Sequence, residues 1–295
     1  MTLVAADPAL FNDPFEVRPC FDQERHDYFA STHEAFHAQF GFSHSLLGTG
    51  SMVGLPTENA VDFGEQINER FRRDLSRRFR VVCLSRDPSS VLMWGHYTKS
   101  HSGLVLGIDT SVPRYPSGLK PEGFEIQYPS DGSRIKLPLG YYRGISVEQY
   151  DLSGRVVNRP DELVQGDGGL LIPFSEYWRR VESASIALLS TKNLDWAYEK
   201  EVRFIYELPT QGNQLRIENG RCFLPIPPTA LREVILGFRA PFTLTEEVVN
   251  LFKAGRLGNP LLFHAGCHPY RYEVQRHQDK PDYLLDYYKA ARRRL

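Results

Sequence analysis

The sequence predicts one globular domain, residues 1–295, of mixed α/β or α+β class, with a mixed β-sheet core and flanking helices. Of the 295 residues, 41 % are hydrophobic and 24 % are charged, a composition typical of a globular chain that buries a sizeable core. Helical and strand-like apolar patterns alternate along the chain. Because we find no internal repeat and no long linker, we expect a single domain.

The first half of the chain is expected to be mainly helical. A His- and Phe-rich helix is predicted over 26–47, followed by a Gly/Ser loop over 48–54. The next helix has an apolar residue at every fourth position, at Phe63, Ile67, Phe71, Leu75 and Phe79. A strand over 80–85 follows, and Asp87-Pro88 is expected to cap a helix that continues through Tyr97.

The second half alternates strands with helices. A buried strand is predicted over 103–109, and the Pro-, Gly- and Asp-rich stretch 110–170 predicts short strands and long loops. A helix over 173–189 leads into a strand over 199–207. The remaining predictions are a strand over 234–237, a helix that a capping box opens at Thr243–Glu246, and a strand over 270–274.

Charge and cysteine content limit the classes of partner. The formal net charge is −1, so no overall field points to nucleic acid or to a membrane surface. No apolar run approaches 18 residues and the first residues lack a basic region, so we expect no membrane partner. The four cysteines are scattered without a Cys-x-x-Cys pair, which fits free thiols in a reducing compartment, the cytoplasm.

The segment Trp196–Arg203 carries the most informative polar pattern. If it is a strand, alternation places Glu199, Glu201 and Arg203 on one face, with the carboxylates about 7 Å apart. The other face, which continues through Val202, Phe204 and Tyr206, is expected to face the core. Such a row can bind a ribose hydroxyl, stabilise a cation or activate a nucleophile, with Arg203 organising the carboxylates or a phosphate. The structural alternative is a half-buried strand that shows its charges to water.

His96 and His101 are five residues apart, a spacing that does not place them on one helical face, so no metal site is expected. In a nucleotide site, Tyr97 would stack on a ring and His96 would bind a ribose or phosphate. Alternatively, His96 packs against Trp94 or a carbonyl, and His101 caps the following turn. A metal-dependent hydrolase that uses both histidines and the two glutamates is a further alternative.

Two other positions are candidates for ligand contact. Ser85 ends a buried strand, where α/β folds usually place ligands, although it can equally be a plain turn residue. Asn12 begins Asn-Asp-Pro, a turn-forming sequence that has either a structural role or a ligand contact. If one site uses Ser85, His96, Tyr97 and the glutamates, the strand 80–85, the following helix and the strand 199–207 must meet around one cleft, walled by Trp94 and Trp196.

Three blocks combine into a family resemblance: Phe11–Glu16, then Cys83–Ser85 with Met93–Gly103, then Trp196–Arg203. In this order and spacing they resemble the bacterial domain-of-unknown-function family twenty-nine seventy-one, over roughly residues 3–240. The layout is also similar to ADP-ribosyltransferases: a strand, a Pro/Ser turn, a helix near a Met, and a late strand with Glu-x-Glu. The similarity to the DNA-modifying branch of that superfamily is closest around 84–93.

The resemblance implies an ADP-ribosyltransferase-like domain that takes NAD as its substrate. Glu201 would be the catalytic residue that holds the nicotinamide ribose and stabilises an oxocarbenium-like transition state. Glu199 would act on the side of the acceptor, which is a protein, a nucleic acid or water. The implied NAD contacts are Ser85, His96, Tyr97, His101, Arg203 and Asn12. A toxin or anti-phage effector would fit this chemistry.

The N-terminus does not fit the resemblance to ADP-ribosyltransferases. In ADP-ribosyltransferases the first strand carries a His or Arg that anchors NAD, whereas here residues 1–4 stand almost directly before Phe11–Glu16. We therefore expect that strand to be absent. Its loss would favour the alternative to an enzyme, a non-catalytic nucleotide- or nucleic-acid-binding module with a decayed site.

Overall fold

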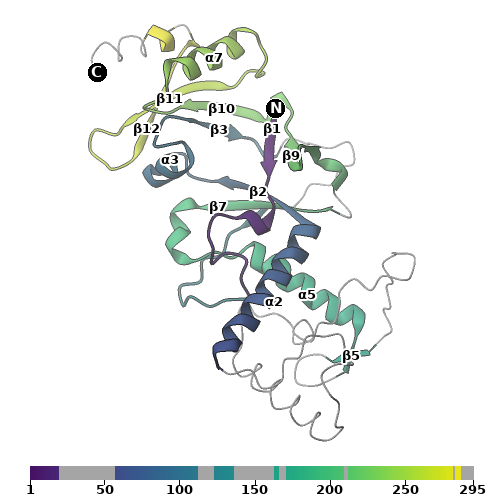
Figure 1. Cartoon of the computed structure of the whole chain (residues 1–295). Helices are drawn as coiled ribbons and strands as arrows, with labels where there is room; N and C mark the ends of the chain where they lie inside the picture. Colours follow the sequence, from purple (N-terminus) through teal and green to yellow (C-terminus); the bar gives the residue numbers. More distant parts are fainter. Residues whose placement is uncertain are drawn as a thin grey trace, which may run out of the picture. The chain divides into compact units, whose positions relative to one another are not determined.

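The computed structural model describes residues 1–19, 57–111, 123–135, 163–165, 171–208, 212–281 and 283–286 (Figure 1). The chain divides into two compact units. Unit 1 comprises Met1–Asp7, Phe79–Tyr128 and Leu194–Leu295, and unit 2 comprises Pro8–Arg78 and Pro129–Asn193. The mixed α and β class is as expected, and a single domain over 1–295 stays a prediction.

The first sheet of unit 1 is antiparallel, with β7 (Glu201–Glu207) between β2 (Phe79–Ser85) and β4 (Gly123–Glu125). Ser85 is paired with Glu201 in the β2–β7 register. All residues of β7 but the last are buried, on both faces of the strand. The expected strand over 80–85 is therefore confirmed, and its partner is the strand that begins at Glu201.

A second sheet, β1-β9-β8, contributes to the same core. Its strands are β1 (Thr2–Ala5), β9 (Arg221–Pro225) and β8 (Arg216–Glu218). The core cluster shared with β2 and β7 contains Val82, Val202, Phe204, Tyr206, Ala5, Cys222 and Leu224. The expected core face of β7 is thus confirmed. The expected absence of an N-terminal strand is wrong, because Thr2–Ala5 pairs with β9, although it carries neither His nor Arg.

The third sheet of unit 1 has the order β12-β11-β10-β3. The strands are β3 (Leu104–Ile108), β10 (Leu231–Leu236), β11 (Leu261–Cys267) and β12 (Val274–Gln278). The parallel strands β10 and β11 are joined through helix α7, as such pairs require a crossover.

Helices pack on both faces of this sheet (Figure 1). Helix α7 (Phe242–Lys253) packs against Val234 and Leu236 through Val248 and Val249. The intervening Ile235 points to the other face, where it clusters with Trp94 of α3 (Val91–Tyr97). Alternation of side chains along β10 therefore gives each helix its own apolar surface.

Several local expectations in unit 1 are wrong. Residues 270–273 are not a strand: β12 begins at Val274, and its partner β11 was not predicted. The capping box at Thr243 is also absent, since Pro241 precedes the helix without a side-chain cap and the Thr245 hydroxyl donates to the Pro241 carbonyl. Proline's fixed φ supplies the turn into α7 instead.

Unit 2 is built on the helices α2 (Thr57–Arg78) and α5 (Phe174–Leu189), both of which were predicted. Phe71 and Leu75 of the four-residue repeat are buried. The unit also contains η1 (Pro8–Leu10), β5 (Leu163–Gln165) and β6 (Leu171–Pro173). The predicted helix over 26–47 and loop over 48–54 lie outside the described residues.

Arg78 and Glu182 link the two helices of unit 2 by an ion pair of 3.4 Å. Arg72 donates to the Ala9 carbonyl at 2.7 Å and ties η1 to α2. In the part of the chain that the structure describes, we find no helix with the length and apolarity needed to cross a bilayer.

Gly237, which follows β10, allows a close backbone approach. A Cβ at this position would lie 2.1 Å from the His101 carbonyl oxygen. We expect Gly237→Ala to lower the free energy of unfolding by about 1–3 kcal/mol or more, because backbone must move. Gly95→Ala is the control: its Cβ would meet nothing within 4 Å, and helix propensity should raise stability by about 0.5–1 kcal/mol. Urea unfolding measures both, and equal effects would contradict the proposed close approach.

Candidate functional site

The candidate site lies in unit 1, where β2 ends, α3 begins and the 3-10 helix η3 (Leu194–Glu199) runs into β7. Glu199 is therefore not on the strand, contrary to the prediction. Lys200 separates it from β7 with a left-handed φ of 46°, and its N–H donates to Ala197 at 3.2 Å to close the last helical turn. The predicted one-face row of Glu199, Glu201 and Arg203 is thus broken after its first member.

Glu201 and Arg203 do share a face of β7, and they form a buried bidentate ion pair. Arg203 Nε lies 2.8 Å from Glu201 Oε1, and Nη2 lies 2.9 Å from Oε2. The Glu201 side chain is only 7 % exposed and that of Arg203 only 1 %. The alternative of charges displayed to water is therefore wrong, and the carboxylate is held in one orientation by a planar fork.

Glu199 joins three segments that are distant in sequence. Its carboxylate, which is buried, accepts a hydrogen bond from Tyr97 Oη at 2.6 Å. Its main-chain carbonyl accepts a hydrogen bond from Ser85 Oγ at 2.7 Å. The end of β2, the last residue of α3 and the end of η3 are thereby brought together. Ser85 and Tyr97 are themselves exposed to solvent.

Asp87 organises the turn between β2 and α3. Its Oδ1 accepts hydrogen bonds from Ser89 N at 2.8 Å and from Ser89 Oγ at 2.6 Å. Lys200 Nζ lies 2.8 Å from Oδ2. The hydrogen bond from Lys200, then that from the Ser89 hydroxyl, lower the pKa of Asp87 from 3.8 to about 2. The helix cap is Ser90, whose Oγ accepts from Met93 N, and not Asp87-Pro88 as predicted.

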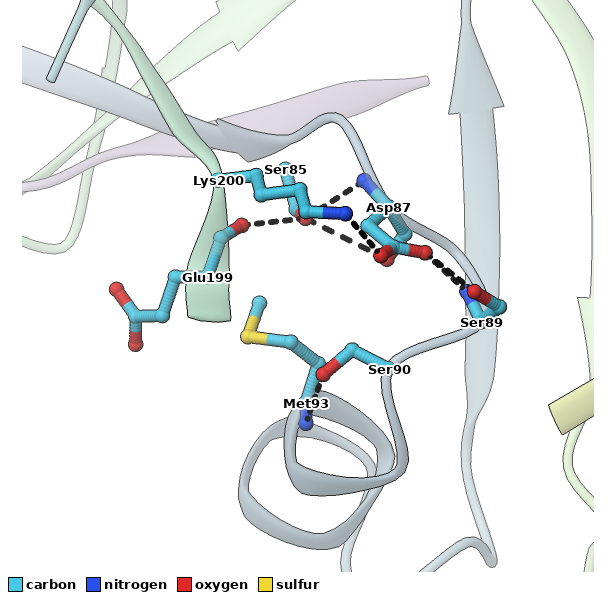
Figure 2. Close-up of polar contacts among 7 residues, drawn as sticks. All are labelled: Ser85, Asp87, Ser89, Ser90, Met93, Glu199 and Lys200. Atoms are coloured by element: carbon cyan, nitrogen blue, oxygen red, sulfur yellow. Dashed lines mark hydrogen bonds and ion pairs between the residues drawn. The ribbon is translucent and has the colours of Figure 1, made fainter. Parts of the chain in front are cut away.

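Figure 2 shows how this turn is arranged around the start of β7. The Lys200 ammonium group is directed toward Asp87, whereas the Glu199 carboxylate points away from it. The side chain of Met93 extends from α3 toward the segment that carries Glu199. Adjacent residues of opposite charge thus serve different contacts, because the left-handed Lys200 turns the chain between them.

The two candidate histidines lie in different surroundings. His96 is exposed, and its ring centroid is 6.3 Å from that of Tyr198, not packed on Trp94. His101 instead stacks on Trp94 with a centroid distance of 6.1 Å and an interplanar angle of 6°. Burial, then the charge of Arg239, lower the pKa of His101. Because Trp94 packs against the β10–β11 sheet, it is a core residue and not a wall beside Glu199.

Asn12 belongs to unit 2 and is exposed. The turn there is made by its neighbour Asp13, whose Oδ1 accepts from Phe15 N at 2.8 Å. Among the described residues, no three His, Cys, Asp or Glu side chains gather in a group that could hold a metal ion.

Two of the cavities that the described residues form lie within single units, and neither is lined by Glu199 or Glu201. A cavity of about 280 Å³ in unit 2 is bordered by Glu16 and Lys192, whose charged atoms lie 3.8 Å apart. A larger cavity of about 870 Å³ in unit 1 is bordered by His101 and by the loop between β11 and β12. This loop, which was predicted to be a strand, carries Tyr-Arg-Tyr at 270–272, where aromatic and basic side chains alternate.

Comparison with known proteins finds no matching family model, and no curated protein or solved structure with significant similarity to this chain.

The Tyr97–Glu199 hydrogen bond should stabilise the site measurably. We expect Tyr97→Phe to lower the free energy of unfolding by about 1.5–3 kcal/mol, because a buried carboxylate loses one donor. Tyr283→Phe is the control, since the Tyr283 phenol is exposed and makes no hydrogen bond to another described residue. Equal stability of the two variants would contradict this contribution.

The Lys200–Asp87 contact predicts a pH dependence. Because the pKa of Asp87 is lowered, the stabilisation from its carboxylate is complete above about pH 4 and is lost as the pH falls toward 2. In Lys200→Met the pKa should rise toward 3.8, and stability should fall less between pH 4 and 2. NMR titration of Asp87 checks this, with Lys280→Met as the control. An unchanged Asp87 pKa in Lys200→Met would refute the assigned cause.

Proposed function

We propose that this protein is an ADP-ribosyltransferase that uses NAD as its substrate. The observation that carries the proposal is the meeting of Ser85, Tyr97 and Glu199 directly before the strand that begins at Glu201. These residues come from the segments on which the resemblance to ADP-ribosyltransferases rests. Membership of family twenty-nine seventy-one, an ADP-ribosyltransferase-like fold, a cytoplasmic location and a role as toxin or anti-phage effector belong to the same proposal.

In the proposed reaction, the bond between ribose C1′ and the nicotinamide nitrogen breaks, and its electron pair leaves with neutral nicotinamide. Positive charge develops on the ribose, where the Glu201 carboxylate stabilises it and accepts a hydrogen bond from a ribose hydroxyl. An oxygen or nitrogen atom of the acceptor bonds to C1′ and loses a proton to Glu199. The acceptor is a protein side chain, a nucleobase or water.

The ion pair gives Arg203 a positioning role in this reaction. A carboxylate has about four acceptor positions, and Arg203 occupies one on each oxygen of Glu201. The guanidinium also compensates the buried negative charge and fixes its direction. Arg203 is therefore assigned to orienting Glu201, in place of the direct NAD contact that the resemblance implied.

Exposed side chains around Glu199 provide the NAD contacts. Tyr97 offers its ring for stacking, His96 a ribose or phosphate contact, and Ser85 a hydroxyl at the strand end. His101 borders the unit 1 cavity and Asn12 belongs to unit 2. NAD contacts by these last two residues stay predictions.

One observation favours a second candidate function, a non-catalytic nucleotide-binding module. Glu201 is the proposed catalytic residue, yet its side chain is only 7 % exposed and is engaged by Arg203. Such a site would bind NAD through the exposed Ser85, His96 and Tyr97 without breaking the glycosidic bond.

Turnover of NAD by the purified chain distinguishes the two candidates. We expect nicotinamide release, and Glu201→Gln should lower its rate by at least about 100-fold, because one contact to the transition-state charge is lost. Glu207→Gln is the matched control, on the same strand and face and half-buried. Glu199→Gln should reduce transfer to an acceptor more than it reduces hydrolysis of NAD.

Wild-type turnover by folded Glu201→Gln would exclude the catalytic assignment, and NAD binding without any turnover would support the module. Since Glu201→Gln weakens a buried ion pair, unfolding curves must accompany the rates. Ser85→Ala and Tyr97→Ala, at exposed positions, remove a hydroxyl and a stacking ring with the pair intact, and each should weaken NAD binding. Unchanged binding in both variants would remove these residues from the proposed site.

A further inference from the structure

The cavity of about 870 Å³ in unit 1 has the size of a ligand site and an aromatic border. Three aromatic side chains there are largely exposed: Tyr272 fully, Tyr270 at 91 % and Phe238 at 49 %. His268 orients Tyr270, since its Nδ1 accepts the Tyr270 N–H at 3.1 Å and the two rings meet edge to face at 6.3 Å. Large flat rings are therefore presented to solvent around one hollow.

The same border carries positive charge. Arg239 and Arg271 line the cavity, with Glu273 as the one acidic residue among its described lining. Glu273 Oε1 lies 3.8 Å from Arg271 Nη1, so these two charges compensate each other within the border. Arg239 makes no ion pair with another described residue. The hollow thus combines aromatic faces with the Arg239 guanidinium, which forms no ion pair within the described part of the chain.

The turn after α3, which contributes Ser100 and His101 to the cavity lining, has a strained backbone. Lys99, Ser100 and His101 have left-handed φ values of 50°, 55° and 68° in succession. Arg239 N donates to the His101 carbonyl at 2.9 Å, and the His101 ring stacks on buried Trp94. Consecutive non-glycine residues in this conformation cost free energy and persist only where the surroundings impose them, as they often do at binding sites.

We propose that this cavity binds single-stranded nucleic acid, with bases stacked on Tyr270, Tyr272 and Phe238 and a backbone phosphate held by Arg239. Sequence-tolerant strand binding uses this combination of aromatic platforms and positive charge. The chain as a whole has a formal net charge of −1, so attraction of a strand has to come from a local site such as this one. The inference does not depend on the proposed transferase activity.

The test is a titration of the full chain, without NAD, against labelled oligothymidine and oligouridine of about ten nucleotides. Tyr270→Ala and Tyr272→Ala should each weaken binding about tenfold, because one stacked base is lost, without changing the salt dependence. Arg239→Gln should reduce the slope of log K against log salt by about 0.7, the value for one phosphate contact with a single strand. A stronger complex with one oligonucleotide identifies DNA or RNA as the occupant.

Tyr283→Ala and Arg256→Gln are the matched controls, exposed residues of unit 1 outside the cavity lining, and both should bind as the wild type does. The tested tyrosines are exposed, so thermal unfolding should be unchanged in their variants. The proposal is overturned if the wild-type chain binds neither oligonucleotide or if the cavity variants match the controls. It is also overturned if a duplex, or a single nucleotide, binds as tightly as the strand.

Discussion

The buried Glu201–Arg203 ion pair constrains the middle strand of the first sheet. Both side chains lie on one face of β7, and neither reaches bulk water to any large extent. Such a pair gains little net stability over apolar residues, but removal of one partner leaves an uncompensated charge and costs about 3–5 kcal/mol. The strand therefore needs both residues together, whatever chemistry the carboxylate performs.

The turn before this strand depends on Lys200. A non-glycine residue with φ of 46° costs of order 1 kcal/mol or more. Two contacts offset that cost, since its carbonyl accepts from Arg86 N at 3.0 Å and its ammonium binds Asp87. Both partners come from the loop after β2. The conformation of Lys200 and the position of that loop therefore support each other, and the Glu199 side chain is placed by the result.

Periodicity was sufficient to predict α2, α5, β2 and the core face of β7, because each has a regular apolar pattern that tertiary packing then uses. It failed at 196–199, where the alternation that suggests a strand belongs to the 3-10 helix η3. β11 was overlooked because its Leu-Leu-Phe-His-Ala-Gly-Cys sequence lacks alternation between polar and apolar residues. Such a strand is specified by its neighbours, which a local pattern does not contain.

For the candidate site, the sequence predicted that Ser85, Tyr97 and Glu199 lie together, and hydrogen bonds join them in the structure. The sequence did not place Glu201 in a buried pair, because burial depends on what covers a strand. The sequence did not predict the unit 1 cavity for a related reason. Its border is formed by the turn after α3, the segment after β10 and the loop between β11 and β12, which are distant in sequence, and the hydrogen bond from Arg239 N to the His101 carbonyl joins the first two.

The interleaving of the two units has a consequence for biosynthesis. Strand β1 pairs with β9 and β2 pairs with β7, and the Ser85–Glu199 bond alone spans 114 positions in the chain. During translation, β1 and β2 emerge from the ribosome long before their partners. Contacts of such large sequence separation slow folding. The edges of these early strands stay unpaired until the later strands arrive, and an unpaired strand edge is a template for association with other chains.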